Sequence, residues 1–366
     1  MRTAHPDYIF VGSIIGLVFF GVLALLSATS LLVPNDTYFF VKRQVMLGII
    51  PGSVAFWFMM RTPYTRLRSL SFWVFGGSII LLLLVLIPGI GSTQDTFARS
   101  WIKLFGLSFQ PVELAKVALI IFLAHWLSRT KPSDLQNWQT GFLPFIVPLG
   151  LIGGLLFAQP DVGSLLLISC IALSLFIVGG GQWRYMLGMV AIAVIAVLIL
   201  IIFKPQSHIV QRLKVFAYPE VDPLGASWQI HQSYVAVGSG GFFGAGWGKS
   251  RQKFQYLPQV QADAIFPIMA EELGFAGSGA FVIFLLFIFF RMMRIARASP
   301  DRFGMLITVG VAAWLVGQSF INMATMLGIM PLTGVPLPLV SHGGTTMFMM
   351  LLSLGIVANI SSYART

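Results

Sequence analysis

A chain of 366 residues of which 57% are hydrophobic and only 10% are charged is not an ordinary soluble domain, where about a quarter of the residues carry charge. The formal net charge of +11 is dispersed over short segments between apolar runs. That pattern argues against nucleic-acid binding and favours contact with anionic lipid or a phosphorylated lipid substrate. The only cysteine, Cys170, excludes an intrachain disulfide, and the first apolar run is too long for a cleavable signal peptide.

About ten apolar segments reach or approach the roughly 20 residues that a membrane-spanning helix needs. In chain order these segments cover residues 8–30, 44–60, 70–88, 111–128, 142–158, 163–180, 185–203, 264–290, 304–328 and 345–361. The sequence therefore predicts an all-α polytopic membrane protein that forms a single domain over residues 1–366. A large loop, 204–262, separates the seventh and eighth helices.

Positive charge gathers in the connections on the N-terminal side of the membrane. The cations on that side are Arg2, Arg61, Arg66, Arg68, Arg129, Lys131, Arg184, Arg291, Arg294, Arg297, Arg302 and Arg365. The short connections on the other side offer Lys42, Arg43, Arg99 and Lys103, with Lys116 just inside a span. This bias predicts cytoplasmic N- and C-termini and an extracytoplasmic loop at 204–262.

The extracytoplasmic loop has the pattern of a folded segment at a membrane surface. Asp222 and Pro223 fit a helix N-cap followed by proline at the first helical position. Apolar residues at roughly helical spacing from Trp228 to Val237 then predict an amphipathic helix lying on the membrane, with an ordinary structured loop as the alternative. The glycine-rich run 238–248 permits sharp turns.

Charged residues follow these glycines and continue into the next apolar segment. They are Lys249, Arg251, Lys253, Asp263, Glu271 and Glu272. Carboxylates at membrane depth are strongly disfavoured unless function needs them. The stretch 238–272 therefore predicts a site for an anionic substrate at the membrane surface.

A second irregular stretch, 328–346, lies between the last two spans. Pro336 and Pro338 cannot continue a helix. Because exposed irregular backbone is not tolerated in lipid, we expect a broken or re-entrant segment that lines a cavity before the tenth helix. The chain shows no internal repeat of the kind found in many transporters.

Several motifs in this order resemble those of the SEDS family (shape, elongation, division and sporulation), and the resemblance covers nearly the whole chain. They are ARSWI at 98–102, FQPVELAK at 109–116, QPDVG at 159–163, RL at 212–213, DPLG at 222–225, GSGG at 238–241, EELG at 271–274 and PLPLVSHGG at 336–344. The run 248–258 resembles the division-type branch (FtsW) more than the elongation-type branch (RodA). The chain departs from the family pattern in the neighbours of Asp263 (Gln261, Ala262 and Ala264), in Val112 in place of serine, and in His342 in place of tyrosine.

The resemblance implies a peptidoglycan glycosyltransferase of the bacterial cytoplasmic membrane. Such an enzyme polymerises lipid II at the outer face, for septal or cell-shape wall synthesis, by an inverting single displacement with undecaprenyl pyrophosphate as the leaving group. It also implies a class B penicillin-binding protein as partner, which would cross-link the glycan, because this chain has no transpeptidase motif. The reaction needs one general base and positive charge for the pyrophosphate.

Asp263 is the candidate base, because it lies at the entrance to the eighth span. The alternative is a carboxylate that only favours the helix N-terminus. Glu113 and Lys116 share one helical face at i,i+3 spacing, so they form either part of the substrate site or a modest helix ion pair. The full set of predicted substrate-binding residues is Lys116, Glu113, Arg99, Arg212, Arg251, Ser341 and His342. Asp161, Glu271 and Glu272 are expected to be buried and structural.

No metal site is predicted, because the five histidines show no i,i+4 pairing and there is one cysteine. A divalent cation, Mg²⁺ or Mn²⁺, that bridges the substrate pyrophosphate remains open. Two other functions compete with polymerisation. A lipid II flippase would also use intramembrane carboxylates and a broken segment, but it needs polar groups reachable from both faces. A structural scaffold would leave Asp263 and the Glu113–Lys116 pair unexplained.

Overall fold

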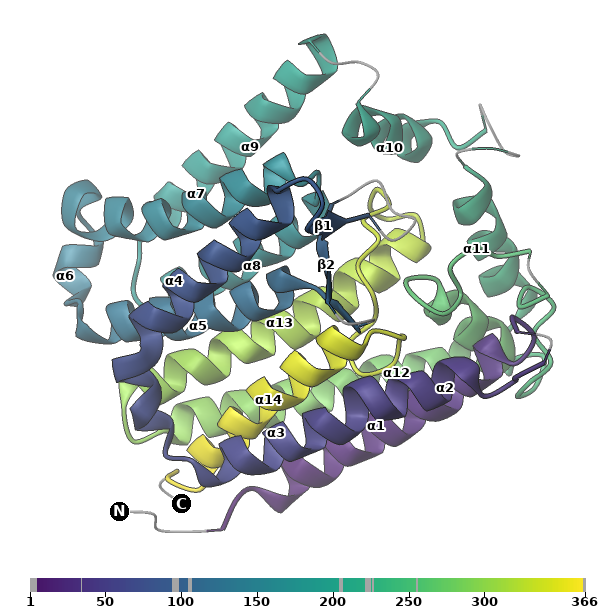
Figure 1. The fold of residues 1–366 in the computed structure, drawn as a ribbon, viewed down its shortest axis with the longest axis horizontal. Coiled ribbons are helices and arrows are strands. Elements are labelled where there is room, and N and C mark those ends of the chain that lie inside the picture. The colour runs from purple at the N-terminus through teal and green to yellow at the C-terminus, as the bar shows by residue number, and fades with distance from the viewer. Residues whose placement is uncertain are drawn as a thin grey trace.

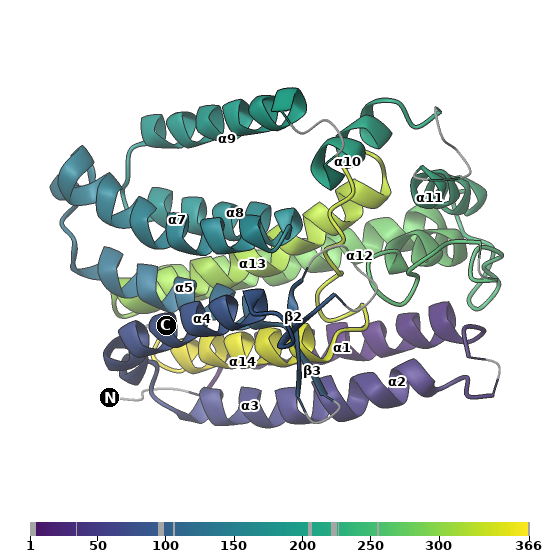
Figure 2. The same cartoon turned by 45° about the horizontal axis from the view of Figure 1, so that its top comes forward.

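The structure, a computed structural model, describes residues 5–33, 35–93, 99–104, 107–203, 207–220, 225, 227–254 and 256–364. Long helices lie side by side in one bundle, and α9 lies at its outside, beyond α7 and α8 (Figures 1 and 2). The helices are α1 (Tyr8–Thr29), α2 (Phe39–Gln44), α3 (Ile50–Arg61), α4 (Leu67–Leu86), α5 (Pro111–Arg129), α6 (Pro132–Leu135), α7 (Leu143–Ala158), α8 (Val162–Val178), α9 (Trp183–Phe203), α10 (His208–Ala217), α11 (Trp228–Ser239), α12 (Ile265–Ala298), α13 (Arg302–Met326) and α14 (Gly344–Ser361).

Each predicted apolar segment coincides with a helix. Within the described residues, eight helical stretches are long and apolar enough to cross a membrane, and α8 is a shorter apolar helix. The second stretch begins earlier than predicted, at Phe39, and passes through a π-helical turn at Val45–Ile49 before α3. The prediction of a helical polytopic membrane protein is confirmed.

A small antiparallel sheet accompanies the helices, and the sequence analysis did not predict it. It comprises β1 (Gly91–Ser92), β2 (Trp101–Leu104) and β3 (Leu107–Phe109), in the order β1-β2-β3. Ile102 pairs with Gly91 on one side and with Phe109 on the other. These strands are too short to show a period-2 apolar pattern, so the sequence indicated only a loop between the third and fourth spans.

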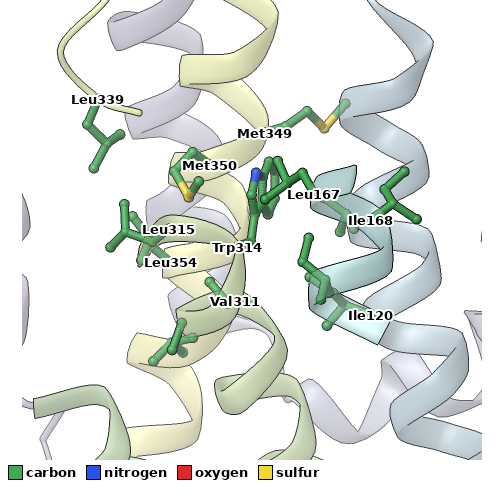
Figure 3. Packing of buried hydrophobic residues seen from close by; sticks show 14 of the residues in the cluster. Ile120, Leu167, Ile168, Val311, Trp314, Leu315, Leu339, Met349, Met350 and Leu354 are labelled. Carbon is green, nitrogen blue, oxygen red and sulfur yellow. The ribbon is translucent and has the colours of Figure 1, made fainter. Parts of the chain in front are cut away.

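The core is organised around α13, which packs against α5, α8, α12 and α14. Trp314 of α13 is fully buried, and it lies among side chains from α5, α8 and α14, such as Ile120, Leu167 and Met350 (Figure 3). A helix that is apolar on all sides, as α13 mostly is, belongs in the interior of a bundle. Any polar side chain on α13 therefore needs a partner from another element.

Both ends of the described chain lie at the same end of the bundle (Figure 1). The main-chain nitrogen of Asp7 donates to the Ser361 hydroxyl at 2.9 Å, and the Asp7 carboxylate pairs with Arg291 at 2.7 Å. Arg68 pairs with Asp301, the N-cap of α13, at 2.6 Å. α11 lies at the opposite end, and the sheet lies near the N-terminal end of α14, which the irregular segment 331–343 precedes (Figures 1 and 2).

The loop between α9 and α12 is folded, as predicted, but differently in detail. The helix predicted after Trp228 is present as α11, and it buries Ile230 and Ala236 while Tyr234 and Val235 stay exposed. The predicted N-cap at Asp222 and Pro223 lies outside the described residues. The sequence analysis did not predict α10, whose N-terminus Ser207 caps.

The glycine-rich run packs against a kink in α12 at Gly274, where the backbone adopts φ 69°. A Cβ on Gly274 would lie 2.3 Å from the Gly244 nitrogen, so the glycine-rich run and α12 can approach each other this closely only because both residues are glycine. Phe275 donates its main-chain N–H to the Gly241 carbonyl at 2.9 Å across this contact. The predicted sharp turns are therefore present, and they serve to join this run to α12.

Candidate active site

Asp263 is buried immediately before α12, and residues from three other elements surround it. Gln229 of α11 donates a hydrogen bond from Nε2 to Asp263 Oδ1 at 3.3 Å. Asn322 of α13 donates from Nδ2 to the main-chain oxygen of Asp263 at 2.7 Å. The N-cap position of α12 belongs to Ala264, with no side-chain cap, so the Asp263 carboxylate is free of the capping role.

Burial raises the pKa of the Asp263 carboxyl to about 6, against the opposing effects of its hydrogen bonds and of the nearby Arg212 charge. Arg212 of α10 donates from Nη1 to the Thr333 carbonyl at 3.3 Å. A Cβ on the neighbouring Gly334 would lie 3.9 Å from Asp263 Oδ2. The structure thus brings the predicted base, one predicted cation and the irregular segment together.

Glu113 and Lys116 form a fully buried pair near the start of α5. Lys116 Nζ lies 2.7 Å from Glu113 Oε1, and the two side chains are only 2% and 3% exposed. Lys116 also donates to Gln318 Oε1 at 3.2 Å and lies over the Trp314 ring at 4.9 Å. Glu113 Oε2 has no hydrogen-bond partner among the described residues. The pair is therefore more deeply desolvated than the sequence predicted.

Two side-chain amides of α13 join this pair to the surroundings of Asp263. Gln318 Nε2 donates to the Pro336 carbonyl at 2.8 Å, and Asn322 Nδ2 donates to the Val335 carbonyl at 2.8 Å. Sequence reasoning missed Gln318, Asn322 and Gln229. A recognisable signal for the first two was present, because amides four residues apart in an apolar span need buried partners.

Ser341 and His342 hold the end of the irregular segment in place. The Ser341 hydroxyl accepts a hydrogen bond from the Leu337 nitrogen at 2.9 Å, and the Ser341 carbonyl accepts one from Gln44 at 3.1 Å. The His342 nitrogen donates to the Gln261 carbonyl at 2.8 Å. Burial, with a smaller effect from Arg43, lowers the pKa of His342 to about 4, so its imidazole is neutral at pH 7.

The structure separates the remaining predicted cations into two groups. Arg99, Lys249 and Arg251 are exposed, while Lys253 is 5% exposed and lies 3.4 Å from Glu272. Lys253 therefore belongs to a buried structural cluster and is not available to a substrate. Arg251 joins the same cluster through its main-chain nitrogen, which donates to Glu271 Oε1 at 2.8 Å.

The buried carboxylates of α12 behave as expected of structural groups. Glu271 accepts a hydrogen bond from the Ser250 hydroxyl, and Glu272 accepts one from Ser27 of α1 at 2.6 Å. Asp161 is partly buried and caps α8 by accepting from the Ser164 nitrogen at 3.0 Å. These contacts fix the loop 245–254 and the α7–α8 hairpin.

Among the described residues, no group of three or more His, Cys, Asp or Glu side chains could hold a metal ion. Asp263 is the carboxylate of this site, and its described neighbours include the amides of Gln229 and Asn322 and the guanidinium of Arg212.

Comparison with known proteins identifies relatives over the full chain. The family model described as "Cell cycle protein", which covers FtsW, RodA and SpoVE, matches residues 7–366. A probable peptidoglycan glycosyltransferase FtsW from Geobacter sp. (strain M18) is 36% identical over 367 residues, which is 100% of this chain and 99% of that protein. Stage V sporulation protein E from Bacillus subtilis (strain 168) is 35% identical over 373 residues, again 100% of this chain and 99% of that protein.

Solved structures share the fold. A chain from a peptidoglycan synthase complex that coordinates polymerization and crosslinking superposes with a TM-score of 0.81 at 26% identity, with 97% of each chain covered. The rod shape determining protein RodA from Thermus thermophilus superposes with a TM-score of 0.71 at 26% identity, covering 97% of this chain and 96% of that one. With a family match from residue 7 to the C-terminus, the chain belongs to the SEDS family of FtsW, RodA and SpoVE proteins, and the predicted resemblance is confirmed.

Proposed function

We propose that this protein is a peptidoglycan glycosyltransferase that polymerises lipid II, at the outer face of the bacterial cytoplasmic membrane, for septal or cell-shape wall synthesis. One observation carries the proposal: a buried carboxylate, Asp263, lies next to Gly334 of the irregular segment, whose neighbouring Thr333 carbonyl accepts a hydrogen bond from Arg212. The names of the relatives, which include probable peptidoglycan glycosyltransferases, support the same reaction class.

Asp263 acts as the general base in a single displacement. Its carboxylate accepts the proton of the acceptor C4 hydroxyl while that oxygen forms a bond to the donor anomeric carbon. The bond between that carbon and the pyrophosphate breaks at the same time, and undecaprenyl pyrophosphate leaves with both electrons. Because the nucleophile enters opposite the leaving group, an α-linked donor gives a β-1,4-linked glycan, and no covalent enzyme intermediate is needed.

Positive charge near Asp263 stabilises the departing pyrophosphate. Arg212 is the candidate for this charge, because its guanidinium donates to the Thr333 carbonyl near Asp263 and suits bidentate contact with phosphate. The exposed Arg99 and Arg251 are free to approach the substrate from outside. A Mg²⁺ or Mn²⁺ ion bound to the substrate pyrophosphate would add to this charge. The buried Glu113–Lys116 pair helps to hold the site in shape through Gln318, which contacts both Lys116 and the Pro336 carbonyl.

The test of this proposal is turnover by the purified protein in detergent or nanodiscs. Labelled lipid II should be converted into glycan strands of several disaccharides with release of undecaprenyl pyrophosphate. Nuclear magnetic resonance of the product should show only β linkages. An α linkage between sugars would contradict the single displacement, and an absence of polymer from folded protein, with and without the partner, would contradict the enzyme assignment.

We propose that both termini lie in the cytoplasm and the loop at 204–262 lies outside. The twelve cations counted on the N-terminal side support this orientation, as does the shared position of both chain ends in the bundle. A cysteine placed at Ser207 or Gln255 in a Cys170→Ser background should react with an impermeant maleimide in intact cells. Reaction only after permeabilisation would reverse the topology.

A class B penicillin-binding protein with one transmembrane helix is the proposed partner. A similar solved chain comes from a peptidoglycan synthase complex, and this sequence carries no transpeptidase motif of its own. Partner contact should raise the polymerisation rate by biasing the loop at 204–262 together with α12 and α13. Rates measured with and without the partner at equal enzyme concentration test this, and equal rates would remove the allosteric part of the proposal.

A further inference from the structure

Two amides on one face of α13 hold successive carbonyls of the irregular segment. Gln318 donates to the Pro336 carbonyl and Asn322 donates to the Val335 carbonyl, both at 2.8 Å. The two residues are four positions apart, so their side chains lie one above the other on the helix. Both are fully buried, with 0% of their surface exposed. A carbonyl in this interior is costly without a donor, so these bonds fix the path of residues 335–336.

Each amide has a second contact, and the two second contacts lead to different polar centres. Gln318 Oε1 accepts hydrogen bonds from Lys116 at 3.2 Å and from Trp314 at 2.7 Å. Asn322 Nδ2 also donates to the main-chain oxygen of Asp263 at 2.7 Å. The irregular segment therefore connects with the Glu113–Lys116 pair through Gln318 and with the candidate base through Asn322.

The segment makes further contact with the surroundings of Asp263. The Thr333 carbonyl accepts from Arg212, Gly334 lies next to the Asp263 carboxylate, and the His342 nitrogen donates to the Gln261 carbonyl. A displacement of residues 333–336 would thus move both the groups that face Asp263 and the neighbours of Arg212. Because residues 333–336 are closely packed and hydrogen-bonded on both sides, a shift of this backbone is passed on to the residues that contact it.

We propose that Gln318 and Asn322 are positioning residues that hold residues 333–336 against both polar centres. Through them, the position of Asp263 depends on the buried Glu113–Lys116 pair. The inference rests on the proposed function, because it gives Asp263 the role of base. Neither amide contacts substrate in this assignment. Each amide acts through residues 333–336, and loss of either amide should change the position of the Asp263 carboxylate.

The test uses substitutions that keep side-chain volume and remove the amide. Gln318→Met, Asn322→Leu and the double variant are compared with Ser319→Ala. Ser319 is buried on the same helix, but its hydroxyl donates only within α13, to Leu315. Lipid II polymerisation by the purified complex gives kcat and KM, and melting temperature reports folding. Each single variant should lose about tenfold to a hundredfold in kcat, as expected of a base misplaced by up to about 1 Å, with KM nearly unchanged. Ser319→Ala should keep the wild-type rate.

Two readouts separate positioning from a general loss of structure. If the amides act through one segment, the double variant should be about as slow as the slower single variant, whereas independent effects would multiply. The acid limb of the rate–pH profile should also move to lower pH in Asn322→Leu, because loss of the bond to the Asp263 main-chain oxygen loosens this residue and lets water reach its carboxylate. Multiplied losses, or losses that only follow melting temperature with an unchanged pH profile, would overturn the inference.

A third readout does not depend on activity. Hydrogen exchange followed by mass spectrometry should show faster exchange over 331–343 and over 259–264 in both Gln318→Met and Asn322→Leu. Faster exchange confined to α13 would overturn the inference even if the enzyme assignment holds. Conversely, normal polymerisation by an Asp263→Asn variant would refute the base while this exchange pattern still decides whether the two amides hold the segment.

Discussion

The Asp263→Asn variant is expected to lose glycan polymerisation, while lipid II binding and assembly with the partner persist. Asparagine keeps the shape of the side chain and its contact with Gln229, but it cannot accept the proton of the acceptor hydroxyl. General-base catalysis is typically worth about 10²–10⁴-fold, so the residual rate should lie at or below the detection limit of a gel assay.

A matched control for this variant is Asp36→Asn. Asp36 lies in another loop and pairs with the exposed Lys42 at 3.0 Å, so its neutralisation should leave polymerisation near the wild-type rate. Near-normal glycan synthesis by Asp263→Asn would refute the base and return Asp263 to the alternative role of a helix-terminal carboxylate.

The pH dependence of the wild-type rate follows from the same residue. Burial raises the pKa of Asp263 to about 6, so below that pH the carboxyl is protonated and cannot accept a proton. The rate should therefore rise as the pH increases through about 6 and level off above it. The measurement is the initial polymerisation rate from pH 4.5 to 8. An acid limb centred near 4, the ordinary range of an aspartate, would show that the carboxylate is hydrated in the working enzyme.

Removal of the charge at Lys116 is expected to cause a much larger loss than removal at Lys42. Lys116→Met would leave the Glu113 carboxylate buried without its partner, and breaking a buried pair in this way costs about 3–5 kcal/mol. Lys42→Met removes a side chain that is 58% exposed from a surface pair, which is worth about 0–1 kcal/mol. Thermal unfolding and polymerisation at matched expression give the comparison.

A double variant separates the two roles of this pair. Glu113→Gln with Lys116→Met removes the stranded charge, so the melting temperature should recover in part. Polymerisation should stay low, because Gln318 loses the Lys116 contact on one side. Comparable losses in Lys116→Met and Lys42→Met would contradict the importance assigned to the buried pair.

Hydropathy predicted the helices well because a bilayer permits little other than long apolar helices. The positions of α5, α12 and α14 follow directly from apolar runs that end at polar or irregular sequence. The ion pair of Glu113 and Lys116 was also predictable, since i,i+3 spacing alone places the two residues on one helical face. Asp263 could be singled out because it is the only carboxylate between the cationic glycine-rich run and the eighth span, and because the family resemblance includes this aspartate.

Contacts between residues far apart in the chain were not predictable in the same way. Nothing local indicates that Lys253 would be buried against Glu272, whereas Lys249 stays exposed. The partners of Gln318 and Asn322 come from α5, from the residue before α12 and from the irregular segment, so only the tertiary fold brings them together. The sheet of β1, β2 and β3 was not predicted, because its strands are only two to four residues long.

The most direct test of the central claim sets polymerisation against lipid transport in one preparation. The purified protein is reconstituted into liposomes with fluorescent lipid II in both leaflets, with and without the partner. Glycan strands are resolved on a gel, and lipid II translocation is followed by quencher accessibility. We predict a ladder of glycan strands from the wild type, no ladder from Asp263→Asn, and the same slow translocation in both. Translocation that depends on the protein, with no polymer formed, would contradict the assignment and support the flippase.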